Sequence, residues 1–297
     1  MTYPKFTVVT PTYNQGQFIE KTIDSVLSQG YPNLEFIIID GGSKDNTVEI
    51  IKKYEHHLTY WVSELDRGQS HAINKGFAHG TGSILAWLNS DDWYTPGSLS
   101  RFVEAYLAYP DCHVWVGDGD MIDPKGDVFY RPKFAGDITL DSLFQWMTDH
   151  DFMQPSAAFS RTAWEACGPL DEEEHIALDV DLWLRIAKAG FQFARIPDVL
   201  SHSLAHPGAK TTALREQMYA EAALVIARHG GHRAVKPVLA EQIKRLQVCQ
   251  NKLDWYDRNY AIVTGHPWVR MIRPLVKFAA KDMAGVWAKT PPAWVKK

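Results

Sequence analysis

The chain has 297 residues, of which 45% are hydrophobic and 22% charged, the composition of a globular enzyme with a large buried core. This argues against a disordered chain, and a formal net charge of -4 gives no overall basic field for general nucleic-acid binding. Three widely spaced cysteines without a CxxC pair indicate neither a disulfide framework nor a zinc site.

The first residues lack a basic stretch followed by an extended apolar core, so no secretory signal is expected. No segment approaches 18 consecutive apolar residues, the length that a membrane-spanning helix needs. We therefore expect the chain to act on the cytoplasmic side, either free or attached to the inner face of the membrane.

The first half alternates short apolar runs with amphipathic helical patterns, which is typical of a parallel sheet covered by helices. The strands expected there are 6–10, 34–40, 58–62 and 83–88. Helical stripes are predicted over 18–27 and 48–54. Further strands are expected at 114–116, 157–160, 191–196 and 199–203.

Beyond Pro96 the pattern becomes mixed. A hairpin turn is predicted at 124–127 and a helix over 179–189, but from about residue 211 the pattern is helical only, including 214–227 and 238–256. We predict two parts, an α/β domain over 1–207 and a C-terminal helical extension over 208–297.

Polar residues follow three of the apolar strands. Thr10, Asp40 and Asp91 all fall where a predicted strand ends. Ligands of open α/β sheets bind just past the carboxyl ends of the strands, so these separate segments are expected to converge on one crevice, as a nucleotide pocket requires.

The segment Asn89–Asp92 carries two adjacent carboxylates. They would repel each other unless a cation or hydrogen-bond donors offset their charge, and hard oxygen ligands suit Mg²⁺ or Mn²⁺ bridging to a diphosphate. The alternative is that Ser90 or Asp92 caps the next helix.

Neither common phosphate-binding loop is present. A dinucleotide fingerprint needs GxGxxG after the first strand, where this chain has Pro11 to Asn14, and no P-loop occurs. A metal is therefore expected to neutralise the phosphates. The glycine turn in 40–47 could by itself be no more than a helix cap.

Four segments taken together resemble the successive motifs of family-two inverting glycosyltransferases of the GT-A fold. They are VVTPTYNQGQFIEKTIDSVLSQGYPNLEFIIIDGGSKDNT, SELDRGQSHAINKGF, WLNSDDWYTPGSL and ALDVDLWLRIAKAG. The resemblance spans about residues 5 to 210. It implies an α/β GT-A domain with a mostly parallel central sheet, a nucleoside-diphosphate sugar as donor, with UDP the expected nucleotide, and Mn²⁺ or Mg²⁺.

The resemblance also implies a donor site. The residues that would line the base pocket or contact the base are Pro11, Thr12, Tyr13 and Asp40. Those that would border the ribose and phosphates are Asp66, Gln69, the Asn74-Lys75-Gly76 turn, Asn89 and Ser90. Many relatives have Asp where this chain has Asn89, which leaves the motif one carboxylate short.

For the metal, the resemblance implies Asp91 and Asp92, with Asp91 favoured as the direct ligand. His206 resembles a downstream histidine that completes the metal site or faces the diphosphate, and Lys210 would add positive charge there. The alternative for His206 is a loop side chain in solvent.

On the acceptor side, residues 178–183 resemble the motif that carries the catalytic base. Asp179 matches the base, while Leu178 replaces the usual glutamate. For Asp181 we prefer a carboxylate favoured by the helix dipole. Trp183 is either helix core or a platform for a sugar, and Gln154 either borders the acceptor site or is a polar strand entry.

The resemblance thus implies an inverting transfer to a glycan or lipid-linked acceptor, in bacterial cell-surface polysaccharide synthesis. Asn89 and Leu178 keep an alternative open, a catalytically silent nucleotide-sugar-binding or scaffold protein. An amphipathic, basic stretch at 268–289 either lies on an anionic membrane surface or packs on the catalytic domain.

Overall fold

A computed structural model describes residues 3–132, 134, 136–148 and 151–236, with isolated positions at 239, 240, 247 and 251. The chain divides into two compact units, residues 1–238 and 239–297. The helix expected at 238–256, apart from those isolated positions, and the amphipathic stretch at 268–289 lie outside the described residues. The two-part division at residue 207 stays a prediction.

The described elements alternate strand and helix through the first hundred residues. The strands are β1 Phe6–Thr12, β2 Leu34–Asp40, β3 Tyr60–Ser63, β4 Ile84–Trp87, β5 Asp92–Tyr94, β6 Cys112–Ile122, β7 Val128–Tyr130, β8 Ala157–Ser160 and β9 Gln192–Leu204. The α-helices are α1 Ile19–Leu27, α2 Thr47–Lys53, α3 Gln69–His79, α4 Ser98–Ala108, α5 Leu140–Leu143, α6 Arg161–Cys167, α7 Leu178–Lys188, α8 Lys210–Ala213 and α9 Arg215–Arg228. Two short 3-10 turns are η1 Glu55–His57 and η2 Gln154–Ser156.

Within the described residues, the strands form one nine-stranded mixed sheet in the order β3-β2-β1-β4-β8-β6-β9-β5, with β7 added beside β6. β1 pairs in parallel with β2 and β4, β2 with β3, and β6 with β9. β5, β7 and β8 pair antiparallel with their neighbours. Most strands therefore share one direction, as expected, and their carboxyl ends meet at one edge.

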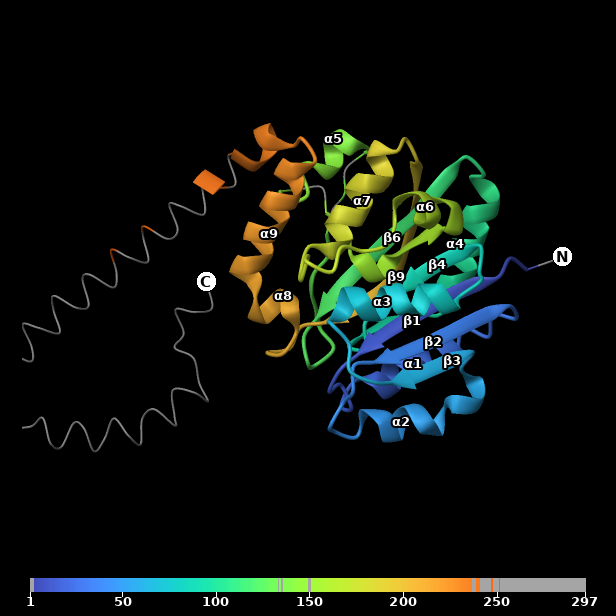
Figure 1. Cartoon of the computed structure of the whole chain (residues 1–297). Coiled ribbons are helices and arrows are strands. Elements are labelled where there is room, and N and C mark those ends of the chain that lie inside the picture. Colours follow the sequence, from blue (N-terminus) through green and yellow to red (C-terminus); the bar gives the residue numbers. More distant parts are fainter. Residues whose placement is uncertain are drawn as a thin grey trace, which may run out of the picture. The chain divides into compact units, whose positions relative to one another are not determined.

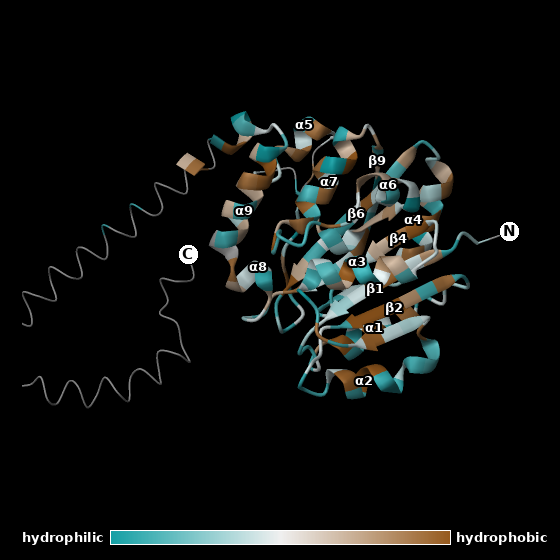
Figure 2. Ribbon diagram, viewed as in Figure 1, coloured by the Kyte–Doolittle hydropathy of each residue, from teal (hydrophilic) through white to brown (hydrophobic). Residues whose placement is uncertain are grey.

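Helices cover both faces of this sheet (Figure 1). On one face α3, α6, α7 and α9 pack over the side chains of a large aromatic and aliphatic core. On the other face α1, α2 and α4 cover a second core. The middle of β2, residues 36–39, is apolar, whereas α2 alternates hydrophobic and hydrophilic residues (Figure 2). A strand buried on both faces needs this continuous apolar run.

Three parts of the fold differ from the sequence prediction. The strands expected at 191–196 and 199–203 are one strand, β9, which runs through Pro197 and pairs with β6 with three shifts of register. β5 was not expected, because three residues carry too little periodicity. The Asn74-Lys75-Gly76 segment was predicted as a turn but lies inside α3.

Gly76 explains that last error. A Cβ on Gly76 would lie 2.4 Å from a methyl carbon of Val9, so only glycine lets α3 pack this closely on β1. A glycine beside a lysine and an asparagine looks like a turn in the sequence, yet here it serves helix–sheet packing.

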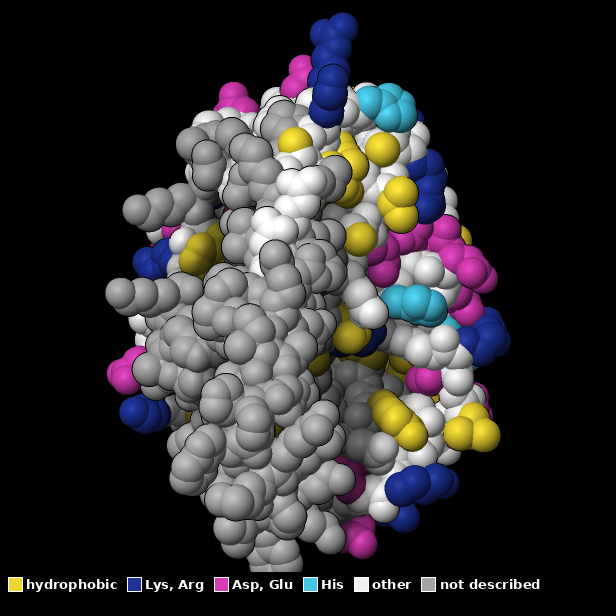
Figure 3. Space-filling model, turned by 90° about the vertical axis from the view of Figure 1, so that its left-hand side faces the viewer, with side chains coloured by type: hydrophobic (Ala, Val, Ile, Leu, Met, Phe, Trp, Pro, Cys, Tyr) yellow, Lys and Arg dark blue, Asp and Glu magenta, His cyan; other side chains and the backbone are white. Residues whose placement is uncertain are grey.

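Acidic and basic side chains are interspersed among the described residues on the face that Figure 3 shows, in keeping with the balanced composition. Within the described part of the chain, every helix is too short or too polar to cross a membrane.

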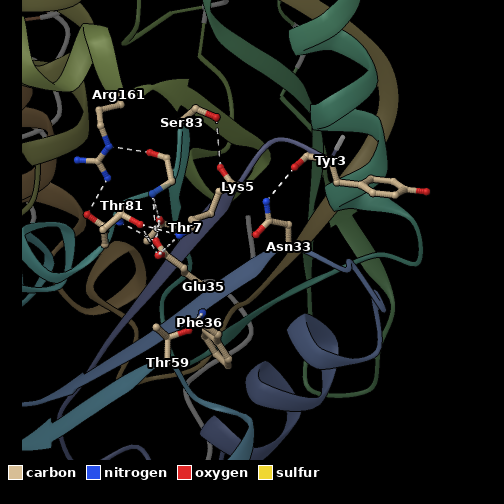
Figure 4. A network of polar contacts seen from close by, with 12 residues as sticks. Tyr3, Lys5, Thr7, Asn33, Glu35, Phe36, Thr59, Thr81, Ser83 and Arg161 are labelled. Carbon is tan, nitrogen blue, oxygen red and sulfur yellow. Dashed lines mark hydrogen bonds and ion pairs between the residues drawn. The ribbon is translucent and has the colours of Figure 1, made fainter. Parts of the chain in front are cut away.

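The opposite edge of the sheet is held by the buried carboxylate of Glu35 (Figure 4). It accepts hydrogen bonds from the Thr7 hydroxyl at 2.7 Å, from the Thr81 amide and hydroxyl at 2.6 and 2.5 Å, and from the Gly82 amide at 3.0 Å. Lys5 forms an ion pair with it at 3.2 Å. These contacts join β1, β2 and the loop that leads into β4.

Burial raises the pKa of Glu35, but the hydrogen bonds from Thr81 and Thr7 outweigh it and lower the pKa to about 2. A carboxyl whose pKa falls on folding stabilises the protein above its unfolded pKa, and the stability is lost as pH falls through the folded value. Glu35 therefore contributes about 3 kcal/mol at neutral pH.

We expect Glu35→Gln to lose about 3 kcal/mol of unfolding free energy at neutral pH, since an amide cannot accept from all these donors. Urea unfolding of wild type should show stability falling between pH 4.5 and about 2, and the variant should show a flatter profile. Glu104→Gln, which removes an exposed pair with Arg101, is the control and should change stability by about 1 kcal/mol or less. Equal losses in both variants would contradict this account.

Candidate functional site

The carboxyl ends of β1, β2 and β3 bring Thr12, Asp40 and Ser63 into one row, because Asp40 is paired in register with both of the others. The Asp40 carboxylate is fully buried and accepts hydrogen bonds from the amides of Gly42 and Ser43 at 3.1 and 3.0 Å. The Ser63 hydroxyl donates to it at 2.5 Å, and so does the Ser43 hydroxyl. Asp40 therefore shapes the loop after β2, while its predicted contact with a base stays a prediction.

Beside this row, hydrogen bonds join the loop after β1 to the loop after β2. The amide of Asn14 donates to the Ser43 hydroxyl at 2.7 Å, and the Lys44 amide donates to the Asn14 side-chain oxygen at 2.8 Å. Asn14 adopts a left-handed conformation with φ 52°, which asparagine tolerates. Tyr13, directly before Asn14, is 57% exposed, so its ring has a free face at the strand ends.

Pro11 and Thr12 are buried at the end of β1. Among the described residues, the Thr12 hydroxyl has no hydrogen-bond partner. A buried hydroxyl without a partner costs free energy, which a polar group of a ligand at this edge would recover.

The loop after β3 reaches the same edge through Asp66. The Gly68 amide donates to its carboxylate at 2.8 Å, and a Cβ on Gly41 would lie 2.8 Å from the other carboxylate oxygen. Glycine at position 41 therefore lets the loops after β2 and β3 approach closely.

Asn74 and Lys75 contact other parts of the chain, and their place beside the ribose and phosphates stays a prediction. The Asn74 amide group exchanges two hydrogen bonds with the backbone of Leu170, at 2.9 and 2.8 Å, and Lys75 pairs with Glu64. Asn74 therefore fastens α3 to the segment before α7.

Asp91 and His206 meet across 115 residues of sequence, with the Asp91 carboxylate 3.1 Å from the His206 Nε2. The His206 ring lies 4.4 Å from the ring of Phe18, and its Nδ1 accepts from the Gly208 amide at 3.2 Å. Since Nδ1 is an acceptor, the proton is on Nε2 and is donated to Asp91. His206 is therefore part of the site and not a loop side chain in solvent.

Asp92 makes contacts different from those of Asp91. It is buried at the start of β5, and its carboxylate accepts from the Asn89 amide at 3.1 Å. Burial and the nearby charge of Asp91 raise its pKa well above the ordinary range, although hydrogen bonds from Ser203 and Asn89 act against this. Asp92 is thus held towards the protonated form. Ser90 is also buried.

A divalent cation fits the Asp91–His206 pair only if other ligands join it. Within the described part of the chain, no group of three or more His, Cys, Asp and Glu side chains is close enough to hold a metal. One carboxylate, one imidazole and the oxygens of a diphosphate suit Mn²⁺, and Mg²⁺ also takes few protein ligands beside phosphates. His206 could ligate only after the proton on Nε2 had left.

A chain of hydrogen bonds joins Asn89, in the same motif as Asp91, to the segment before α7. Gln69 donates to the Asn89 side-chain oxygen at 2.7 Å and accepts from Lys210 at 2.7 Å. Lys210 also donates to the His175 carbonyl at 3.0 Å. Burial lowers the Lys210 pKa, while the charges of Glu221 and Asp91 oppose that shift.

Asp179 lies in the first turn of α7 and is half-buried. Desolvation raises its pKa to about 6, the hydrogen bond from the Val180 amide lowers it, and the charge of Glu221 raises it. A carboxylate with a pKa near neutral is suited to take up a proton in a reaction.

Asp181, two residues further along α7, is buried, and both of its carboxylate oxygens have partners. Arg185 pairs with one at 2.8 Å and His229 with the other at 2.8 Å. These contacts agree with a structural role.

Trp183 requires a correction. Its side chain is fully buried and stacks on Trp87 with ring centroids 5.8 Å apart, so it has no face for a sugar, and the acceptor role is withdrawn. Gln154 donates to the Trp87 carbonyl at 2.9 Å, which sets it beside the end of β4.

Two residues of the site were not predicted. Ser63 had a signal in the sequence, a polar residue at the end of an apolar strand. Glu221, which accepts hydrogen bonds from the Ile176 and Ala177 amides, had none, because it lies on an ordinary amphipathic helix.

A model of the family described as glycosyl transferase family 2 matches residues 7–167, more than half of the chain. The chain belongs to this family. It is therefore a glycosyltransferase, and the matched region runs from the second residue of β1 to the end of α6 and contains the Asn89–Asp92 motif.

Curated relatives are also glycosyltransferases. An uncharacterised glycosyltransferase of Rickettsia typhi is 29% identical over 72% of this chain and 68% of its own length. One of Mycobacterium tuberculosis is 38% identical over 34% of this chain and 40% of its own length. This transferase therefore spans less than two thirds of several relatives that it matches.

Solved structures share the fold. A mannosyltransferase from Pyrobaculum calidifontis in complex with GDP-mannose and Mn²⁺ is 22% identical, with a TM-score of 0.59 over 97% of this chain and 89% of that chain. Residues 1–349 of Staphylococcus aureus TarS in complex with UDP are 20% identical, with a TM-score of 0.59 over 76% and 65%. The transferase has the GT-A fold.

Proposed function

We propose that this transferase moves a sugar from a nucleoside-diphosphate sugar to a hydroxyl of a glycan or lipid-linked acceptor, with inversion at the anomeric carbon. The observation that carries this is the hydrogen-bonded chain from Asn89 through Gln69 and Lys210 to His175, which links the carboxylate motif to the segment that precedes Asp179. A donor site and a base are thus held in one framework.

The donor nucleotide would lie along the ends of β1, β2 and β3, against the exposed ring of Tyr13 and near Asp66. Two structural relatives are described with UDP and with GDP-mannose and Mn²⁺, which supports a nucleotide-sugar donor. UDP is the nucleotide that we propose.

Asp91 and His206 would hold a divalent cation, Mn²⁺ or Mg²⁺, together with the diphosphate. When bound, such an ion offsets negative charge on the phosphates. Lys210, which donates to the neutral oxygens of Gln69 and His175, would supply a positive charge beside it.

In the transfer, Asp179 takes the proton from the acceptor hydroxyl as that oxygen attacks the anomeric carbon. The new carbon–oxygen bond forms on the face opposite the nucleotide, and the electrons of the broken bond leave with the diphosphate. Gln154, beside the end of β4, would border the acceptor. We also propose an acceptor that belongs to bacterial cell-surface polysaccharide synthesis.

A thermal-shift screen of UDP-, GDP- and dTDP-sugars, each with Mn²⁺ and with EDTA, tests the donor. Binding to the folded state alone raises the melting temperature. We expect the UDP series with Mn²⁺ to give the largest shift. Product analysis with the best donor then tests transfer: binding without any transfer or donor hydrolysis would favour a catalytically silent nucleotide-sugar-binding protein.

A further inference from the structure

The segment 170–177, directly before the helix that carries Asp179, has no regular secondary structure of its own and depends on its neighbours. From the donor side, α3 and the loop before it reach this segment. The contacts are Asn74 with the Leu170 backbone, Arg67 with the Glu172 carboxylate at 2.6 and 2.9 Å, and Ser70 with the Glu174 carbonyl at 3.3 Å. These hold the segment at its beginning and middle.

Its end is held by α9. One carboxylate oxygen of Glu221 accepts from the Ile176 amide at 2.7 Å and from the Ala177 amide at 2.9 Å. Ala177 is the residue before the first turn of α7 and is 2% exposed. Its amide would have to be buried without an acceptor if Glu221 were absent.

α9 makes further contacts on both sides of Asp179. Arg228 pairs with Glu174 at 2.6 Å, before the helix, and His229 contacts Asp181 at 2.8 Å, inside its first turn. Every one of these α9 residues lies beyond residue 167, where the family match ends. The contacts that orient this part of α7 are thus supplied by a part of the chain outside that match.

We infer that Glu221 is a positioning residue for the base Asp179: its carboxylate fixes the start of α7, and so the direction in which the Asp179 side chain is held. This rests on the proposed role of Asp179. The inference also requires that turnover depends on α9, which carries Glu221.

The charged groups around Glu221 and Asp179 provide a second measurement, the pKa of Asp179. Besides Glu221, the charged groups that surround this region are Lys210 from α8, Glu174 from the segment, Arg228 from α9 and Asp181, which is paired with Arg185 and His229. The negative charge of Glu221 raises the Asp179 pKa. Glu221→Gln keeps an acceptor oxygen for the two amides but removes that charge, whereas Glu221→Ala removes both.

The test compares Glu221→Gln and Glu221→Ala with Leu224→Ala, a control on the solvent-exposed side of α9. Turnover is measured with the nucleotide sugar that gives the largest thermal shift, binding is measured with UDP and Mn²⁺, and the Asp179 carboxyl is titrated by carbon-13 NMR. The Asp179 signal is assigned by its loss in Asp179→Asn. Melting temperatures report the fold of each variant.

We expect Glu221→Ala to lower kcat by about 10 to 100-fold, because a small displacement of a reacting group has such effects, with an unchanged KM for the donor. Glu221→Gln should restore kcat near the wild-type value, and its Asp179 should titrate at a lower pH. Leu224→Ala should match wild type in all readouts. A structural role alone would lower the melting temperature of Glu221→Ala without lowering kcat per folded molecule.

Two results would overturn the inference: full turnover in Glu221→Ala while Asp179→Asn is inactive, or a kcat of Glu221→Gln as low as that of Glu221→Ala although Gln keeps the acceptor oxygen. Full turnover in Asp179→Asn would instead refute the proposed base. The two failures are thus distinguishable.

Discussion

Replacing Asp179 by Asn is expected to lower turnover by about 10² to 10⁴, equivalent to about 3 to 5 kcal/mol of barrier. Asparagine keeps the shape of the side chain and the acceptor for the Val180 amide, but it cannot take up the proton of the attacking hydroxyl. Interactions shared by the ground and transition states stay in place, so donor binding, measured by the thermal shift with UDP and Mn²⁺, should be unchanged.

The pH profile gives an independent check of this assignment. Because desolvation raises the Asp179 pKa to about 6, the base becomes active as pH rises through that value, and kcat should show an acid limb near it. Asp179→Asn should abolish that limb in its residual activity.

Asp181→Asn is the matched control, two residues along the same helix. Both oxygens of Asp181 are already engaged by Arg185 and His229, so this variant should lose stability and keep most of its turnover per folded molecule. The opposite pattern, an active Asp179→Asn and an inactive Asp181→Asn, would move the base to Asp181.

Replacing Asp91 by Ala is expected to remove the metal-dependent part of diphosphate binding and to lower turnover by about 100-fold or more. In the proposed site, Asp91 and His206, which contact each other, would hold the cation beside the diphosphate. The thermal shift with UDP in Mn²⁺ should fall to the value that wild type shows in EDTA.

Two control variants test whether the effect is specific to Asp91. Asp92→Asn keeps the size of a side chain that is buried and held towards its protonated form, so it should retain the shift in Mn²⁺. Asp111→Ala, on the exposed surface, should behave as wild type. If UDP gave the same shift in EDTA and in Mn²⁺ with the unmodified protein, the metal assignment would be wrong.

Much of the fold could be predicted because some helices and strands have clear local patterns in the sequence. The apolar run 34–40 and the short run 157–160 are strands with the predicted bounds, and the helix predicted at 179–189 is shifted by one residue. Continuous apolar runs and 3.6-residue periodicity depend only on neighbours in sequence. The placement of Asp40 and Asp91 past strand ends followed from the same patterns.

The sequence by itself determined the α/β class, the family and the edge of the sheet where we propose the site, because these depend on local periodicity and on motif order. Only the tertiary structure decided which side chains are partners. It paired Asp91 with His206, turned Asp92 inward, buried Trp183 and set Glu221 against the start of α7. Such contacts join residues tens to more than a hundred positions apart, and their geometry arises from strand pairing and helix packing, which no local pattern specifies.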